Sequence, residues 1–169
     1  MARRFLTYLM FVGDQHGRAE EAMDFYVSLF ENSRILEVER YGPNEEEREG
    51  TLKRARFSLA GRAFGASDSG REHPFTFTPS MSIFVDCENP AELERVFAAL
   101  SEGGEVLMPL DHYGFSQRFG WTNDRFGMSW QLNLPWSNTD ASKRTTVRPA
   151  INSRRTAPRR CVPRGPEHR

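Results

Sequence analysis

The chain has 169 residues, 38% of them hydrophobic and 27% charged, ordinary values for one compact domain or for two small modules sharing a core. No run approaches the roughly 20 apolar residues that a membrane-spanning helix needs. The short apolar stretch near the N-terminus gives way to charge at Asp14, so we expect no signal peptide. The two cysteines, Cys87 and Cys161, form no metal-binding spacing and no disulfide framework, which favours a cytoplasmic protein.

Charge is unevenly distributed along the chain, although its 23 basic and 23 acidic side chains balance. Residues 137–169 carry nine basic and two acidic side chains, a net charge of +7, which leaves −7 for residues 1–136. The same segment is rich in Ser, Thr, Pro and Arg, and it cannot bury enough apolar surface to offset the entropy of ordering it. We therefore predict a folded domain over 1–136 and a disordered basic tail over 137–169.

The first half of the domain reads as a strand, a helix and three more strands. An apolar run predicts a strand at Phe5–Val12, and a broad apolar stripe with acidic residues near its start predicts a helix at Arg18–Phe30. Alternating apolar and charged residues predict a strand at Ile35–Tyr41. After a polar loop, Thr51–Leu59 and Arg62–Asp68 read as a hairpin.

The second half repeats this order. A strand at Ser80–Cys87 precedes a helix that Asn89 and Pro90 open and that two glycines end after Ser101. Three strands follow, at Glu105–Met108, Phe115–Trp121 and Met128–Leu134. A module of four strands and one helix cannot bury both of its faces, so we predict an α+β fold of two paired βαβββ modules, at about 5–70 and 75–135.

Strand alternation separates an apolar face from a mixed one. Met128–Leu134 sets Met128, Trp130, Leu132 and Leu134 against Ser129, Gln131 and Asn133, and Ser80–Asp86 has a mixed face of Ser80, Ser82, Phe84 and Asp86. The apolar faces suit packing under the helices. The mixed faces either line a concave cavity for a small molecule or form the solvated side of a half-buried sheet.

Several segments carry a family resemblance when they are taken in order. They are Met10–Gly13, Ala19–Tyr26, Asn32-Ser33, Arg40–Gly42, Ser82–Cys87, Leu100–Gly104 and Asp124–Gln131. Together they resemble the PhnB-like proteins, often labelled 3-demethylubiquinone-9 3-methyltransferase domains, of the vicinal-oxygen-chelate (glyoxalase/bleomycin resistance/dioxygenase) superfamily. The resemblance covers about residues 5–135 and implies a cupped mixed sheet, usually in a homodimer.

The resemblance also implies where a metal would bind in the superfamily's metal enzymes. It places the ligand positions on Thr7, Ser80 and Gln131, and near Asp68. Thr, Ser and Gln are weak ligands for Zn²⁺, Ni²⁺ or Fe²⁺, which favour imidazole, thiolate and carboxylate groups. We therefore predict no glyoxalase-type metal site and no other cofactor. The methyltransferase label gains no support, because no glycine-rich strand-to-helix loop suited to S-adenosylmethionine is present.

The candidate ligand-binding residues are Thr7, Asp68, Ser80, Ser82, His112, Trp121, Ser129 and Gln131. Gln131 combines strand parity with a family position, although an amide there can also bond across strands. Asp68 can be a base, a weak ligand or a turn residue. His112 can act as an acid or base or be simply solvated, and Trp121 can cap a ligand or lie in the core. The pattern assigns no catalytic residue.

Three functions remain open at this point. The preferred one is binding of a small, partly aromatic or polar molecule in a sheet-lined cleft of a homodimer, without a tightly held metal. The second is a metal-dependent lyase, isomerase or dioxygenase that uses Asp68 and Gln131, with His112 as a further candidate. The third is an interaction protein whose basic tail binds an acidic partner. Nucleic acid is not the expected partner, because no aromatic residue interleaves Arg154-Arg155 and Arg159-Arg160 to stack on bases.

Overall fold

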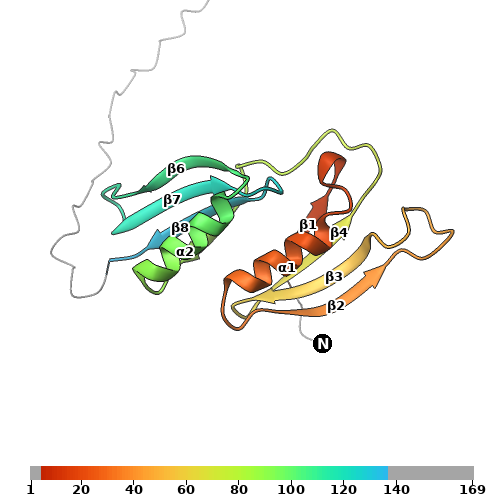
Figure 1. The fold of residues 1–169 in the computed structure, drawn as a ribbon, viewed down its shortest axis with the longest axis horizontal. Coiled ribbons are helices and arrows are strands. Elements are labelled where there is room, and N and C mark those ends of the chain that lie inside the picture. The colour runs from red at the N-terminus through yellow and green to blue at the C-terminus, as the bar shows by residue number, and fades with distance from the viewer. Residues whose placement is uncertain (1–4, 137–169) are drawn as a thin grey trace, which may run out of the picture.

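The computed structural model describes residues 5–136, which form two modules with the same order of elements (Figure 1). The first contains β1 (Thr7–Phe11), the short 3-10 helix η1 (Gly13–Gln15), α1 (Ala19–Leu29), β2 (Arg34–Arg40), β3 (Leu52–Leu59) and β4 (Arg62–Asp68). The second contains β5 (Ser82–Asp86), α2 (Pro90–Ser101), β6 (Glu105–Asp111), β7 (Arg118–Asn123) and β8 (Ser129–Leu134). The predicted α+β fold of two βαβββ modules is confirmed.

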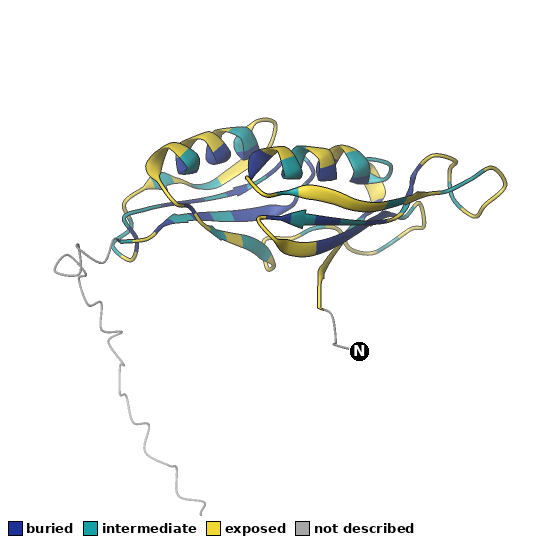
Figure 2. Cartoon of the chain, turned by 90° about the horizontal axis from the view of Figure 1, so that it is seen from below, coloured by how far each residue is buried: buried dark blue, intermediate teal, exposed yellow. Residues whose placement is uncertain are grey.

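Each module folds its strands into one mixed sheet. The strand orders are β1-β4-β3-β2 and β5-β8-β7-β6, and in each sheet the first strand pairs in parallel with the last while the other pairs are antiparallel. Figure 2 shows that both helices lie on the same side of the two sheets. We call the opposite side, which no helix covers, the open face.

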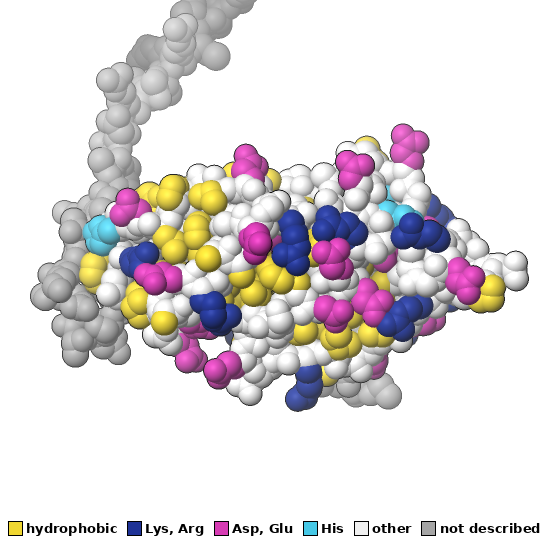
Figure 3. Space-filling model, in the orientation of Figure 1, with side chains coloured by type: hydrophobic (Ala, Val, Ile, Leu, Met, Phe, Trp, Pro, Cys, Tyr) yellow, Lys and Arg dark blue, Asp and Glu magenta, His cyan; other side chains and the backbone are white. Residues whose placement is uncertain are grey.

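The helix side of the sheets supplies the core, as strand alternation predicts. Met128, Trp130, Leu132 and Leu134 are all buried there, and Trp130 is wholly inaccessible. Buried residues of both modules join in a single cluster, so replacing Trp130 by Ala is expected to cost about 3–5 kcal/mol. On the outer surface of this side, basic and acidic side chains lie close together over the first module (Figure 3).

The two helices begin in different ways. The Asn89 side chain accepts a hydrogen bond from the Glu92 backbone N–H (2.9 Å) at the start of α2, and Pro90 occupies its first turn. The residue before α1, Arg18, gives no side-chain cap. Instead, the carboxylate of Asp68, at the end of β4, accepts from the Ala19 backbone N–H (3.2 Å). A residue 49 positions later in the sequence therefore stabilises the start of α1.

A buried carboxylate joins the two modules. Asp124, between β7 and β8, accepts hydrogen bonds from the Tyr26 hydroxyl (2.7 Å), the Trp130 indole N–H (2.8 Å) and the backbone N–H groups of Phe126 (2.8 Å) and Met128 (3.0 Å). Burial raises the pKa of Asp124, although these four hydrogen bonds oppose the shift. The family-like segment Asp124–Gln131 therefore holds the β7–β8 turn against α1.

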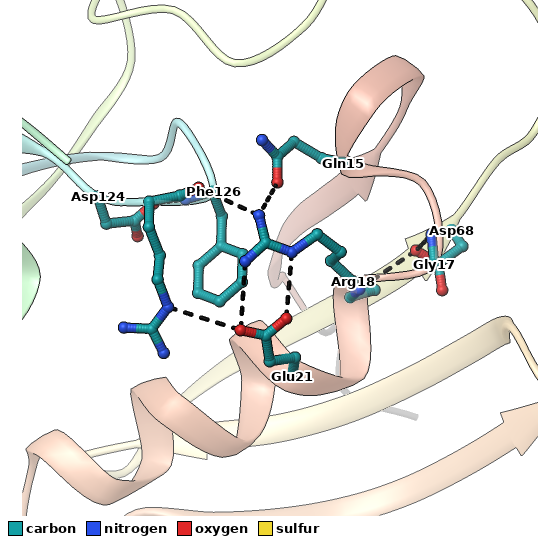
Figure 4. Close-up of polar contacts among 9 residues, drawn as sticks. Gln15, Gly17, Arg18, Glu21, Asp68, Asp124 and Phe126 are labelled. Carbon is teal, nitrogen blue, oxygen red and sulfur yellow. Dashed lines mark hydrogen bonds and ion pairs between the residues drawn. The ribbon is translucent and has the colours of Figure 1, made fainter. Parts of the chain in front are cut away.

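Charged side chains surround this junction at the surface (Figure 4). The Arg18 guanidinium donates to the Glu21 carboxylate (3.1 Å) and to Gln15 Oε1 (3.0 Å), and lies 4.5 Å from the centre of the Phe126 ring. Arg125 approaches the same carboxylate at 3.6 Å. The hydrogen bond from Arg18 is the main cause that lowers the pKa of Glu21. Exposed ion pairs contribute only about 0–1 kcal/mol each, so the buried Asp124 contacts dominate the junction.

Several predicted strand boundaries were wrong by two or three residues, among them the start of the first strand, which is Thr7 and not Phe5. The strand predicted from Ser80 begins at Ser82, and the one predicted from Phe115 begins at Arg118. The strand predicted to end at Met108 continues through Pro109 to Asp111. Because β6 is an edge strand, a proline that lacks a backbone N–H breaks no essential ladder bond there.

The predicted disordered tail at 137–169 lies outside the described residues. Within residues 5–136, no helix is long and apolar enough to cross a membrane.

Candidate functional site

Four of the predicted site residues come together on the open face of the second sheet. They are Ser82 on β5, Trp121 on β7, and Ser129 and Gln131 on β8. Ser82 is in register with Ser129, and Trp121 is in register with Gln131. Residues in register on neighbouring strands share one face, so the four side chains lie on the same side.

Hydrogen bonds fix three of these side chains. The Trp121 indole N–H donates to Ser129 Oγ (2.8 Å), and the hydroxyls of Ser129 and Ser82 lie 2.9 Å apart. Ser129 is wholly buried, so its hydroxyl is held between two partners away from water. The role of this chain of contacts is to orient the indole ring of Trp121.

Gln131 is the exception, because its side-chain amide forms no hydrogen bond with another residue in 5–136. It is half-buried and stands in register between Phe84 on β5 and Trp121 on β7. A glutamine amide offers two N–H donors and one carbonyl acceptor. A polar group with free donors and acceptor between two aromatic side chains can orient a flat ligand.

The sequence argument missed aromatic residues beside this position. Phe119 on β7 lies 6.4 Å from Phe84, between ring centres, and 5.1 Å from Phe115. Phe84 and Phe115 are 54% and 61% exposed, so their rings are available for contact. Phe119 lies two residues before Trp121 in the strand predicted at Phe115–Trp121. The alternation of side chains along that strand could therefore have placed Phe119 on the same face as Trp121. We call Phe84, Phe119, Trp121 and Gln131 the aromatic–amide patch.

The remaining predicted site residues do not join the patch. Thr7 has the strand parity of Leu9 and Phe11, which are buried on the helix side, and Tyr8 takes the open face instead. Ser80 lies in the loop before β5, where its hydroxyl contacts the Thr78 hydroxyl at 2.5 Å.

His112 and Asp68 are also elsewhere. His112 is exposed at the end of β6, and its ring lies 5.5 Å from that of Trp136. Asp68 is buried, and its carboxylate accepts from the backbone N–H groups of Gly17 (2.7 Å), Ala19 (3.2 Å) and Leu52 (2.8 Å). Figure 4 shows Asp68 directed at the turn that precedes α1. These bonds tie β4 to α1 and β3.

The residues at the superfamily's metal-ligand positions do not fit a divalent metal. Asp68 is in register with Phe11, four residues along β1 from Thr7, which at about 3.3 Å per residue separates the two by about 13 Å. Gln131 belongs to the other sheet, and the Asp68 carboxylate already serves three backbone N–H groups. Across residues 5–136, no group of three or more His, Cys, Asp or Glu is arranged to hold a metal ion. Metal-free function stays a prediction.

Cys87 is the one cysteine among the described residues, and its surroundings disfavour the thiolate form. It is buried, and desolvation together with the nearby carboxylates of Glu92 and Asp86 raises the pKa of its thiol to about 12. Only the thiolate attacks electrophiles, so the geometry around Cys87 supports a packing role.

Comparison with known proteins places the chain in a defined group. The family model described as 3-demethylubiquinone-9 3-methyltransferase matches residues 3–133. A solved structure from Bacillus cereus, described as a 3-demethylubiquinone-9 3-methyltransferase, PhnB protein, is 48% identical, covers 78% of this chain and 99% of its own, and superposes with a TM-score of 0.74. A protein from Pseudomonas aeruginosa is 29% identical over 80% of this chain and 100% of its own, with a TM-score of 0.68.

More distant structures share the fold. A glyoxylase/bleomycin resistance protein/dioxygenase domain from Frankia is 12% identical, with a TM-score of 0.52, over 80% of this chain and 99% of its own. The fosfomycin resistance protein FosX from Listeria monocytogenes is 14% identical, with the same TM-score, over 85% of this chain and 98% of its own. A search of curated proteins finds no match.

Proposed function

This chain belongs to the 3-demethylubiquinone-9 3-methyltransferase (PhnB-like) family, and from that premise we propose that it binds a small, partly aromatic molecule on the aromatic–amide patch without a tightly held metal. One observation carries the proposal: the free amide of Gln131 stands between Phe84 and Trp121. A ring held between aromatic side chains gains about 0.5–1.5 kcal/mol per pair beyond its buried area. The Gln131 amide would add a directional hydrogen bond of about 0.5–1.5 kcal/mol.

The proposal includes a homodimer. The open face exposes large apolar side chains in both modules, among them Tyr8 at 48% and Phe84 at 54%. A second copy that faces these sheets would remove apolar surface from water and would turn the patch into a wall of a cleft. Light scattering after gel filtration measures the mass directly, and a monomer at all concentrations would contradict this part of the proposal.

Neither methyl transfer nor metal-dependent chemistry is part of the proposal. The family description names a methyltransferase, but this chain has no glycine-rich loop for a methyl donor. The alternative of a metal-dependent lyase, isomerase or dioxygenase would draw on Asp68, Gln131 and His112, which lie on separate parts of the structure. Stoichiometric metal in protein purified without chelator would favour that alternative.

Binding is tested by the thermal stability of the full chain against a panel of small aromatic compounds. A ligand that binds only the folded state stabilises it by about 2.7 kcal/mol at 100 times its Kd. We expect a saturable rise in Tm that Phe84→Ala and Gln131→Ala reduce. The matched control is Phe75→Ala, which removes a similarly exposed ring (53%) from the loop before β5. Equal shifts in all three variants would exclude the patch as the binding site.

A further inference from the structure

A groove lies between the two modules. It runs between the end of α1 and the β3–β4 turn on one side, and β5 with the start of α2 on the other. Two neighbouring hollows of 420 and 380 Å³ form it, and they share Phe30, Ala60, Val85 and Asp86 in their walls. The smaller hollow is mainly apolar, and its further lining is Leu59, Phe64, Ile83, Phe84 and Trp130, with Arg62 as its one basic residue.

The larger hollow is acidic. Glu31, Asp86, Glu88 and Glu92 line it, against the single cation Arg95. The Arg95 guanidinium donates to the Leu29 carbonyl at 2.9 Å, and its single positive charge leaves the lining of this hollow with a net charge of −3 (four carboxylates against one cation). Within residues 5–136, none of the four carboxylates forms an ion pair with Lys or Arg. Figure 3 shows acidic side chains at the edge of the molecule near the start of α2.

The other glutamate-rich region of the described chain differs in this respect. In the loop between β2 and β3, Glu45 pairs with Lys53 at 2.7 Å and Glu46 pairs with Arg71 at 2.8 Å. Glu47 accepts from the Gly70 backbone N–H at 2.9 Å and faces His16 at 3.5 Å. Two of its carboxylates are thus paired with Lys or Arg. In the groove, Glu92 accepts from the Glu88 backbone N–H (2.8 Å) and Asp86 from the Asn133 amide (2.5 Å), but within residues 5–136 neither pairs with Lys or Arg.

The end of β8 brings the chain to this groove. The Asn133 amide donates to Asp86 Oδ1 (2.5 Å), and the Cys87 backbone N–H donates to the Asn133 carbonyl (2.7 Å). Figure 1 shows β8 ending beside the start of α2. The described chain stops at Trp136, three residues after Asn133. The Trp136 ring lies 5.5 Å from that of His112 at the end of β6. Residues 137–169, with nine basic and two acidic side chains, therefore continue from this end of the second sheet.

We propose that residues 137–169 bind along this groove in the same chain. Their net charge of +7 complements the net charge of −3 that four carboxylates and Arg95 give the larger hollow, and Val147 and Ile151 offer apolar side chains for the smaller hollow. Thirty-three residues reach up to about 110 Å when extended, so length sets no limit. Attachment at Trp136 gives an effective concentration on the order of millimolar, so weak electrostatic contacts suffice. The smaller hollow shares Phe84 with the aromatic–amide patch, whereas the acidic residues of the larger hollow lie outside that patch.

The full chain contains its own probe position. Cys161 lies in the proposed ligand segment, and Cys87 is buried with a thiol pKa of about 12, so a nitroxide reagent labels Cys161 alone. We expect the label to cause a loss of amide NMR intensity at Glu31 and over residues 86–92 in low salt. Raising NaCl from about 0.01 M to about 1 M shortens the Debye length from about 30 Å to about 3 Å, and it should restore the intensity.

Two matched triple variants decide where the segment binds. Asp86→Asn, Glu88→Gln and Glu92→Gln together should abolish the intensity loss in the groove. Glu72→Gln, Glu102→Gln and Glu105→Gln remove three exposed carboxylates elsewhere and should leave the loss intact. Equal effects of the two triples, or intensity loss centred on residues 45–49, would overturn the proposal. The same loss in ¹⁵N protein that carries no nitroxide, mixed with spin-labelled protein of natural isotope abundance, would also overturn it, because the contact would then be between chains.

Discussion

Replacing Asp68 by alanine separates a structural role from a catalytic one. The buried carboxylate accepts three backbone hydrogen bonds, from Gly17, Ala19 and Leu52. Asp68→Ala leaves these N–H groups without an acceptor, and an unsatisfied buried donor costs about 1–3 kcal/mol. Water can hydrate the N–H groups of Gly17 and of the first turn of α1 in the variant, so each of the three lost hydrogen bonds should cost an amount near the low end of that range. We therefore expect the free energy of unfolding to fall by about 3–5 kcal/mol.

Urea unfolding followed by circular dichroism measures this loss, with the midpoint and slope fitted separately. Asp68→Asn keeps one side-chain oxygen but replaces the other by an NH₂ group, which cannot accept a hydrogen bond. It should lower the free energy of unfolding by about 1–3 kcal/mol. The control is Asp24→Asn, an exposed carboxylate on α1, which should change stability by less than about 0.5 kcal/mol. An Asp68→Ala protein as stable as the wild type would refute the structural role and reopen Asp68 as a functional carboxylate.

Three further predictions concern the module junction and the buried thiol. Tyr26→Phe removes the hydroxyl that donates to Asp124 at 2.7 Å and should cost about 1.5–3 kcal/mol in urea unfolding, since the acceptor is charged; no loss would show that Asp124 needs no such partner. Folding raises the pKa of Asp124 above its ordinary 3.8, so the folded state binds the proton of this carboxyl group more readily than the unfolded state does. The free energy of unfolding of the wild type, relative to that of Asp124→Asn, should therefore fall as the pH rises from 3.8 through the raised pKa. A relative free energy that rises with pH would contradict this expectation. In a Cys161→Ser protein, Cys87 should react with a thiol reagent at pH 8 only after unfolding, because its pKa is about 12; rapid labelling of the native protein would show that the thiol is accessible.

Local sequence patterns predicted the fold because two short-range signals agree with the tertiary structure. Asn89 and Pro90 mark the start of α2, where the Asn89 side chain caps the helix. The alternation through Met128–Leu134 identifies the buried face of β8. The β6 boundary was missed because Pro109 reads as a strand breaker, and only knowledge that β6 is an edge strand removes that objection.

The candidate site was predicted only in part, and the reason is that its geometry depends on contacts between distant residues. Gln131, Ser129 and Ser82 follow from strand parity, and the register between strands brings them together. The face of Thr7 could not be chosen from an apolar strand in which both sides look alike. The three backbone partners of Asp68 come from segments 16 to 51 residues away, so no local pattern reveals them.

The central claim is metal-independent binding on the aromatic–amide patch, and calorimetric titration tests it most directly. The best compound from the aromatic panel is titrated into wild-type and Gln131→Ala protein, each with and without EDTA. Loss of one hydrogen bond of about 0.5–1.5 kcal/mol should weaken binding by about two- to tenfold, and EDTA should leave the Kd unchanged. Binding that EDTA abolishes, or that Gln131→Ala leaves unaltered, would contradict the account.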